Sequence, residues 1–107
     1  MNIFTQITQA FARERLTVTN AVTTLTAALY ATGAYRQRAS RVQITVEKAA
    51  IRFTQEGTDP SAVVGSEVGT LANIGDVLLL DGQQAADDFK ATRAGAVNAV
   101  IEVVYFR

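Results

Sequence analysis

The side chains in this sequence best suited to acid–base or metal chemistry are its carboxylates. There are ten of them, and the chain contains neither histidine nor cysteine. Without these two residue types, serine–histidine and cysteine–histidine nucleophilic sites cannot form, and the commonest general base near neutral pH is missing. Thiolate zinc ligation and disulfide bridges are excluded as well. A catalytic or metal site would therefore have to consist of carboxylates.

Two carboxylate pairs are close enough in sequence to be considered as such a site. Asp87 and Asp88 are adjacent, and adjacent side chains on a helical turn do not converge on one point. Glu56 and Asp59 flank a turn and could offer oxygens to a calcium ion, but their spacing matches no complete ligand set. Acidic residues in turns usually bond their own backbone. We therefore predict no catalytic residue, no cofactor and no metal ion, and a protein that is not an enzyme.

The most distinctive local motif is a polar turn that follows the expected strand 50–55. Glycine supplies a positive φ angle at no steric cost, and proline cannot sit in a central strand, so it marks the end of the turn. We expect a return strand beyond it, with Val63, Val64 and Val68 continuing the sheet. The candidate structural turn consists of Glu56, Gly57, Thr58, Asp59 and Pro60.

Several other segments have sequence patterns that predict strands. Residues 41–47 alternate apolar and polar side chains, which is typical of a half-buried strand, and threonine-rich segments at 16–19 and 22–30 favour strands too. Residues 76–81 are almost all apolar, as in strands buried on both faces. Both faces of the segment 96–106 are substantially apolar, which indicates a central strand or one covered by a neighbouring chain. These patterns predict an all-β protein, an antiparallel β-sandwich of immunoglobulin-like or jelly-roll-like type. One helical turn near residues 84–90 should place Phe89 on the core.

The N-terminal residues 2–14 show the apolar spacing of a short amphipathic helix. We expect residues 1–15 to form an N-terminal arm or helix and residues 16–107 to form a single β-sandwich domain. So short a helix must pack on something, and the sequence leaves open whether that is its own sheet or a partner. The candidate partner interface consists of Ile3, Phe4, Ile7 and Phe11.

The charge of the chain is balanced overall but unevenly distributed. Residues 1–52 carry seven basic and two acidic side chains, and residues 53–107 carry three basic and eight acidic ones. Either strands from the two halves pair within one molecule, or the surface is dipolar and helps copies dock side by side. No apolar run approaches the length of a membrane span, so no membrane partner is expected. The arginine-rich segment 31–40 could contact phosphates, but with zero net charge we do not expect nucleic acid as a partner.

The hairpin Ile51-Arg-Phe-Thr-Gln-Glu-Gly-Thr-Asp-Pro-Ser61 resembles a hairpin of immunoglobulin-like domains that occur as accessory modules of chitobiase-type glycosidases. In this chain Glu56 replaces the aspartate of that pattern. The resemblance covers about fifteen residues and implies a carbohydrate-binding accessory module as an alternative function. The chain has no tryptophan, and its tyrosines are scattered, which argues against a platform for sugar stacking.

A longer resemblance, over residues 22–106, is to small structural proteins of tailed bacteriophages. It rests on five segments in a fixed order, namely Thr24-Leu-Thr-Ala-Ala-Leu-Tyr30, Val46-Glu-Lys-Ala-Ala-Ile-Arg52, Gly75-Asp-Val-Leu-Leu-Leu80, Phe89-Lys-Ala-Thr-Arg93 and Ala99-Val-Ile-Glu-Val-Val-Tyr105. The resemblance implies a virion protein, made in the host cytoplasm, and in particular a capsid decoration (cement) protein. Its partners would be the major capsid protein or other virion proteins, and it would form a homo-oligomer, for which a trimer is one option. A neck, tail or baseplate component is the alternative within the same class.

Overall fold

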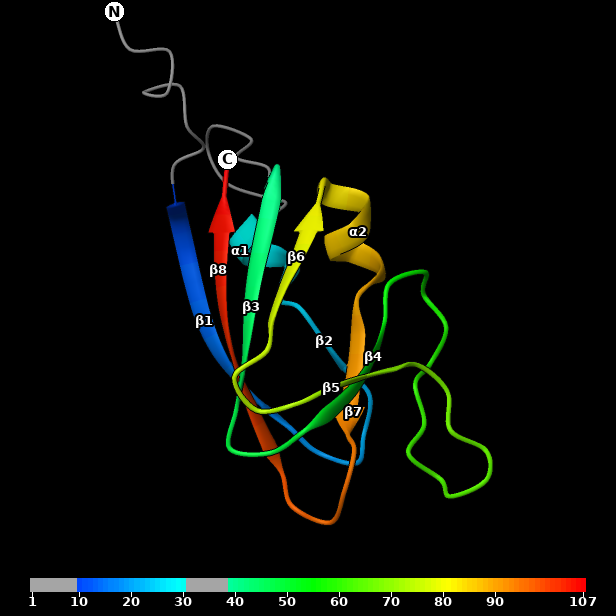
Figure 1. Cartoon of the computed structure of the whole chain (residues 1–107). Coiled ribbons are helices and arrows are strands. Elements are labelled where there is room, and N and C mark those ends of the chain that lie inside the picture. The colour runs from blue at the N-terminus through cyan, green and yellow to red at the C-terminus, as the bar shows by residue number, and fades with distance from the viewer. Residues whose placement is uncertain (1–9, 31–38) are drawn as a thin grey trace, which may run out of the picture.

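The chain folds into two antiparallel four-stranded sheets packed face to face (Figure 1). The computed structural model describes residues 10–30 and 39–107. In spatial order, the first sheet contains β1 (Ala10–Val18), β8 (Ala99–Phe106), β3 (Arg41–Glu47) and β6 (Val77–Asp81). The second contains β2 (Thr23–Thr24), β7 (Lys90–Arg93), β4 (Ile51–Thr54) and β5 (Thr70–Ala72). The predicted all-β sandwich is confirmed.

The strand pairing has the pattern of one long hairpin that has been rolled up. Antiparallel ladders join β1 to β8, β2 to β7, β3 to β6 and β4 to β5. Further ladders join β3 to β8 and β4 to β7, which closes each half of the hairpin into a sheet. This winding is that of an eight-stranded jelly roll. Of the two sandwich types that the sequence allows, the topology therefore matches the jelly roll.

The core lies between the two sheets and follows the alternation expected for β3. Val42, Ile44 and Val46 are fully buried, and the residues between them face outward. Strand β8 is central, between β1 and β3, and its residues Ile101, Val103 and Tyr105 are buried in the core. Between β3 and β4 the chain crosses to the other sheet at Lys48, whose φ of 69° makes the sharp bend. The segment with the clearest alternation, residues 41–47, thus forms a central strand of the core.

The two helices are short. Helix α2 (Gln83–Asp88) forms where a helical turn is predicted, and Phe89 follows it, fully buried. Helix α1 (Ala27–Tyr30) was not predicted, because the threonine-rich alternation of residues 22–30 indicates a strand. That prediction is wrong beyond Thr24. The carboxylate of Glu14 accepts hydrogen bonds from the backbone N–H (3.0 Å) and the hydroxyl of Thr26, and the Leu29 N–H bonds Thr26 O at 3.0 Å, so a turn satisfies this backbone locally.

Residues 10–14, predicted as the end of a helix, lie in strand β1. Their apolar spacing fits a helix, but β8 offers a continuous ladder from Ala12 to Val18 that a helix could not use. A register shift between Ala10 and Ala12 marks a bulge at the start of this strand. The remainder of the predicted helix, residues 2–9, lies outside the described part of the chain.

Two further strand predictions are corrected. Strand β6 is at the edge of its sheet rather than buried on both faces, so Val77 and Leu79 are 54% and 57% exposed. Residues 63 and 64 do not form a return strand, since only an isolated bridge between Ser61 and Val68 joins the two sides of this loop. In both cases the apolar residues are on the surface because no element of the described chain covers them.

Candidate docking surface

Large apolar side chains are exposed mainly in one stretch of the chain. Nine such residues are exposed in the described structure, and seven of them lie between positions 63 and 79. Exposed apolar residues on a small protein can mark an interaction site, and here they are spread over the β4–β5 loop, β5, the β5–β6 corner and the edge strand β6. The seven residues, which we call the apolar segment, are Val63, Val64, Val68, Leu71, Ile74, Val77 and Leu79.

The first part of the apolar segment is the tip of the loop between β4 and β5. The Ser66 N–H donates to Val63 O at 2.9 Å, which closes a four-residue turn. Gly65 takes a φ of 85°, which suits the third position of a type II turn. Val64 occupies the second position and is 91% exposed. The turn thus presents a valine to solvent on a defined backbone.

The second part is the corner at which the chain passes from β5 to β6. The Asp76 carboxylate accepts from the Asn73 N–H at 2.8 Å, and the Asp76 N–H donates back to Asn73 O at 3.0 Å. The Gly75 N–H, at a φ of 90°, is bonded to Val46 O at 2.8 Å. These bonds fix a turn whose apolar residue, Ile74, is 62% exposed. The corner is therefore a fixed apolar projection next to the edge strand β6.

The candidate structural turn, residues 56–60, docks onto the α2–β7 connection. Gly57 has a φ of 90°, and its N–H donates to Asp88 O at 3.1 Å. The Thr54 hydroxyl donates to the carbonyl of Thr58, and Lys90 Nζ lies 2.8 Å from the Asp59 carboxylate. Asp59 thus forms an ion pair with Lys90, and the turn connects the end of β4 to the start of β7.

The predicted partner interface is only partly within the described residues. Ile3, Phe4 and Ile7 lie outside them. Phe11 lies in β1, half-buried against the protein's own core, and the guanidinium carbon of Arg107 lies 5.7 Å from the centre of its ring. Of these four residues, the structure therefore assigns Phe11 to intramolecular packing. Five residues of the apolar segment were predicted to lie in strands, so the segment was missed as a surface; they are Val63, Val64, Val68, Val77 and Leu79.

The outer face of the first sheet carries a charged cluster. Arg15 on β1 lies 3.0 Å from the carboxylate of Glu47 and 3.1 Å from that of Glu102. These carboxylates raise the pKa of the Arg15 guanidinium, with the hydrogen bond to Glu47 as the largest cause. At the other end of the face, Arg41 lies 3.2 Å from Asp81. Because these side chains are largely exposed, we interpret the pairs as organising the surface rather than stabilising the fold.

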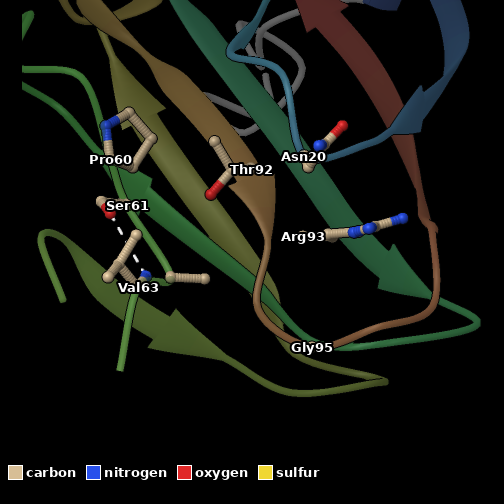
Figure 2. Close-up of a pocket in the computed structure, with 8 residues that line it drawn as sticks. Asn20, Pro60, Ser61, Val63, Thr92, Arg93 and Gly95 are labelled. Carbon is tan, nitrogen blue, oxygen red and sulfur yellow. Dashed lines mark hydrogen bonds between the residues drawn. The ribbon is translucent and has the colours of Figure 1, made fainter. Parts of the chain in front are cut away.

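A polar cavity of about 360 Å³ lies between the β1–β2 connection, the loop after the structural turn and the end of β7 (Figure 2). Ser61 Oγ accepts from the Val63 N–H at 3.2 Å, and Arg93 donates to Asn98 Oδ1 at 2.7 Å. The Thr92 hydroxyl, which Figure 2 shows directed toward Ser61, is buried without a hydrogen-bond partner in the described structure. None of the eight lining residues is acidic or aromatic. The cavity offers hydrogen bonds but no nucleophile with an adjacent base.

Thr92→Val should leave the unfolding free energy unchanged or raise it, because the hydroxyl that it removes is buried and unpaired. The matched variant is Thr54→Val on the neighbouring strand, where the hydroxyl is bonded to Thr58 O. Thr54→Val should cost about 1–2 kcal/mol, since it leaves an acceptor unsatisfied. Urea denaturation of the two variants measures both effects. An equal loss of stability in both would show that the Thr92 hydroxyl has a partner.

Comparisons with known proteins add no assignment to these observations. No protein-family model matches the chain. No curated protein and no solved structure matches it either. Among the described residues there is no group of three acidic side chains that could hold a metal ion. Residues 10–30 and 39–107 also include no helix that is long and apolar enough to span a membrane.

Proposed function

We propose that this protein is a structural component of a tailed-bacteriophage virion, and specifically a decoration protein that binds the assembled capsid and stabilises the head. The ordered sequence motifs over residues 22–106 suggest the class. The observation that carries the proposal for binding is the β4–β5 loop, on which a well-defined turn exposes Val64 almost completely. An apolar side chain that is presented on a hydrogen-bonded turn loses less conformational entropy on insertion into a pocket of a partner than one on an unstructured loop.

The jelly-roll winding is compatible with this proposal but does not decide it. The same architecture occurs in viral capsid proteins and in lectins, and a fold by itself does not specify a function. Neither the polar cavity next to Thr92 nor a second pocket beside β4 and β5 offers a platform on which a sugar ring could stack. The first has no aromatic lining residue, and in the second the aromatic lining residue, Phe53, is buried. The exposed apolar residues therefore favour binding to a protein shell over binding to a glycan.

The direct test uses purified virions of the phage that encodes the chain. An antibody raised against the purified protein should label particles in immunogold electron microscopy, and the label should lie on the head. Label on the neck, tail or baseplate would support a virion protein but reject head decoration. Virions that carry no label and contain no peptide of the chain by mass spectrometry would reject the proposal.

Val64→Asp should weaken binding to heads that lack the protein by at least about tenfold, since a charge would be carried into an apolar contact. The side chain is 91% exposed, so the melting temperature of the free protein should not change. Co-sedimentation of the purified variant with such heads measures the affinity. Val97→Asp is a matched control, because Val97 is 65% exposed but lies in the β7–β8 connection, outside the apolar segment. Equal loss of binding in both variants would contradict the role given to the loop.

A further inference from the structure

The two edge strands of the first sheet differ in charge, because β6 has only the acidic residues Asp76 and Asp81 at its ends, whereas β1 has two arginines and one glutamate. Between Arg52 and Lys90 the chain has seven acidic residues and no basic one, and this stretch includes the edge strand β6. The opposite edge strand, β1, exposes Arg13 and Arg15 on the outer face of the sheet. Figure 1 shows β1 and β6 on either side of the central strands β8 and β3. A second copy placed beside the first would bring unlike charges together.

The edge of β6 has few of the features that normally prevent strand pairing, and these are confined to its end, where Asp81 and helix α2 lie. Charged residues, prolines, bulges and covering elements protect the edges of natural sheets. Strand β6 reads Val-Leu-Leu-Leu-Asp, with a single charge at its end, and its register with β3 is regular over all five residues. Strand β1, in contrast, has a bulge and three charged side chains. These features disfavour pairing of β1 with itself. The bulge lies before residues 13–17, however, so this part of β1 has a regular edge to which β6 of a second copy can bond.

At both free edges of the sheet, the unpaired backbone N–H and C=O groups recur at every second residue, so the two edges can bond to each other. The bonds Val46 N–H to Asp76 O and Gly82 N–H to Ser40 O show that the even-numbered residues of β6 bond to β3. The odd-numbered residues, Val77, Leu79 and Asp81, then direct their backbone groups away from the sheet. The same alternation can be followed across the sheet through the registers of β3 with β8 and of β8 with β1. It leaves the backbone N–H and C=O groups of the odd-numbered residues of β1 directed away from the sheet.

We propose that the protein self-associates head to tail, with the β6 edge of one copy bonded to the β1 edge of the next. Strand β6 runs antiparallel to β1 within the sheet, so a copy in the same orientation continues the antiparallel alternation. In the register that matches charges, Asp81 lies opposite Arg13 of the next copy, and Val77 lies opposite Thr17 of that copy. Five residues give a contact about 17 Å long. Such a heterologous contact produces a ring where the rotation closes and a filament where it does not.

Charge selects this arrangement over a two-fold pairing of β6 with itself. A β6–β6 contact would bring Asp76 and Asp81 of both copies, and the acidic elements around them, to the same interface. Arg13 is exposed and takes part in none of the ion pairs between described residues, whereas the Asp81 carboxylate, 3.2 Å from Arg41 of its own molecule, would be shared with Arg13 of the next copy. The inference is independent of the proposed function, because it requires only the purified protein.

Charge reversal tests the proposal by analytical ultracentrifugation over a concentration series at low salt. The wild-type protein should self-associate, and Arg13→Glu and Asp81→Lys should each weaken that association about tenfold or more. An equimolar mixture of the two variants should recover it, since each copy then meets an opposite charge. Lys48→Glu, which changes the net charge as Arg13→Glu does but at the exposed β3–β4 bend, should have no such effect. A wild-type protein that is monomeric up to about 1 mM, or a mixture that stays monomeric, overturns the proposal.

A disulfide test examines the register without relying on charge. The chain has no cysteine, so the double variant Thr17→Cys/Val77→Cys carries only the two thiols introduced. Residues directly opposite in a hydrogen-bonded antiparallel pair have Cα atoms about 5.5 Å apart, within disulfide range. Mild oxidation should give covalent oligomers on a non-reducing gel. The control variant Thr17→Cys/Val97→Cys should not form covalent oligomers. Equal crosslinking of the two variants, or no crosslinking of Thr17→Cys/Val77→Cys, would contradict the proposed register.

Discussion

Replacing Phe89 with alanine should lower the free energy of unfolding by about 3–5 kcal/mol, among the largest effects of any single substitution in this chain. Phe89 is fully buried where the chain leaves α2 and enters β7. Its ring stacks on Phe53 of β4, with centroids 5.9 Å apart and an angle of 24° between the rings. Alanine would remove that contact and leave a cavity between α2 and the second sheet, which the β-ladders hold too firmly to collapse.

Urea denaturation with a fluorescence or circular dichroism readout measures this loss. A domain of this size has a total stability of about 5–15 kcal/mol, so Phe89→Ala could leave a large unfolded fraction without denaturant. Phe89→Leu is the companion variant, since it keeps most of the volume and should cost less than about 2 kcal/mol. A loss below about 1 kcal/mol for the alanine variant would mean that Phe89 is not part of a close-packed core.

The parts of the fold that the sequence predicts well are those in which a single local pattern decides the structure. Residues 41–47 alternate without exception and form β3 with the expected faces. Gly82 to Asp88 contains no β-branched residue, and α2 forms there, directly before the aromatic residue that it was predicted to bury. In both segments local preference and tertiary packing agree.

Two of the errors arise where the arrangement of strands, which the sequence does not specify, decides the structure, and a third arises from local turn residues. A run of aliphatic residues such as 77–80 is equally compatible with a central strand and with an edge strand, and only the position of β6 beyond β3 shows that it is an edge. Residues 10–14 fit both a helical and an extended pattern until β8 is in place to pair with them. Val63 and Val64 favour strands by composition, but Pro60 before them and the positive φ of Gly65 after them keep the segment in a loop.

The docking surface is harder to predict for a related reason. Apolar residues contribute to a core or to an interface through the same chemistry, so composition alone does not separate the two roles. One signal was available in the loop, where two valines directly precede a glycine in a segment with no regular alternation. The cavity beside Thr92 could not have been found in this way, because its lining residues come from three segments that are far apart in the sequence.

Gly69→Ala should cost about 2–5 kcal/mol, for two reasons that add. Gly69 has a φ of 106°, a region that a residue with a Cβ atom occupies at a cost of about 1–2 kcal/mol. In addition, a Cβ atom at this position would lie 2.7 Å from Phe53 O and 3.2 Å from Phe53 C. Both are backbone atoms of β4, so no side chain can rotate away, and the β4–β5 pairing would have to shift at a further cost of about 1–3 kcal/mol.

Gly65→Ala separates the two contributions. Gly65 has a similar φ of 85°, but a Cβ atom there would meet no atom within 4 Å. Both substitutions reduce the entropy of the unfolded chain by the same amount, so this term cancels when the two variants are compared. Gly65→Ala should therefore cost only about 1–2 kcal/mol, the cost of the positive φ. The difference between the two denaturation curves measures the close approach of Gly69 to β4, and equal losses would mean that the β4–β5 contact is looser than this backbone geometry requires.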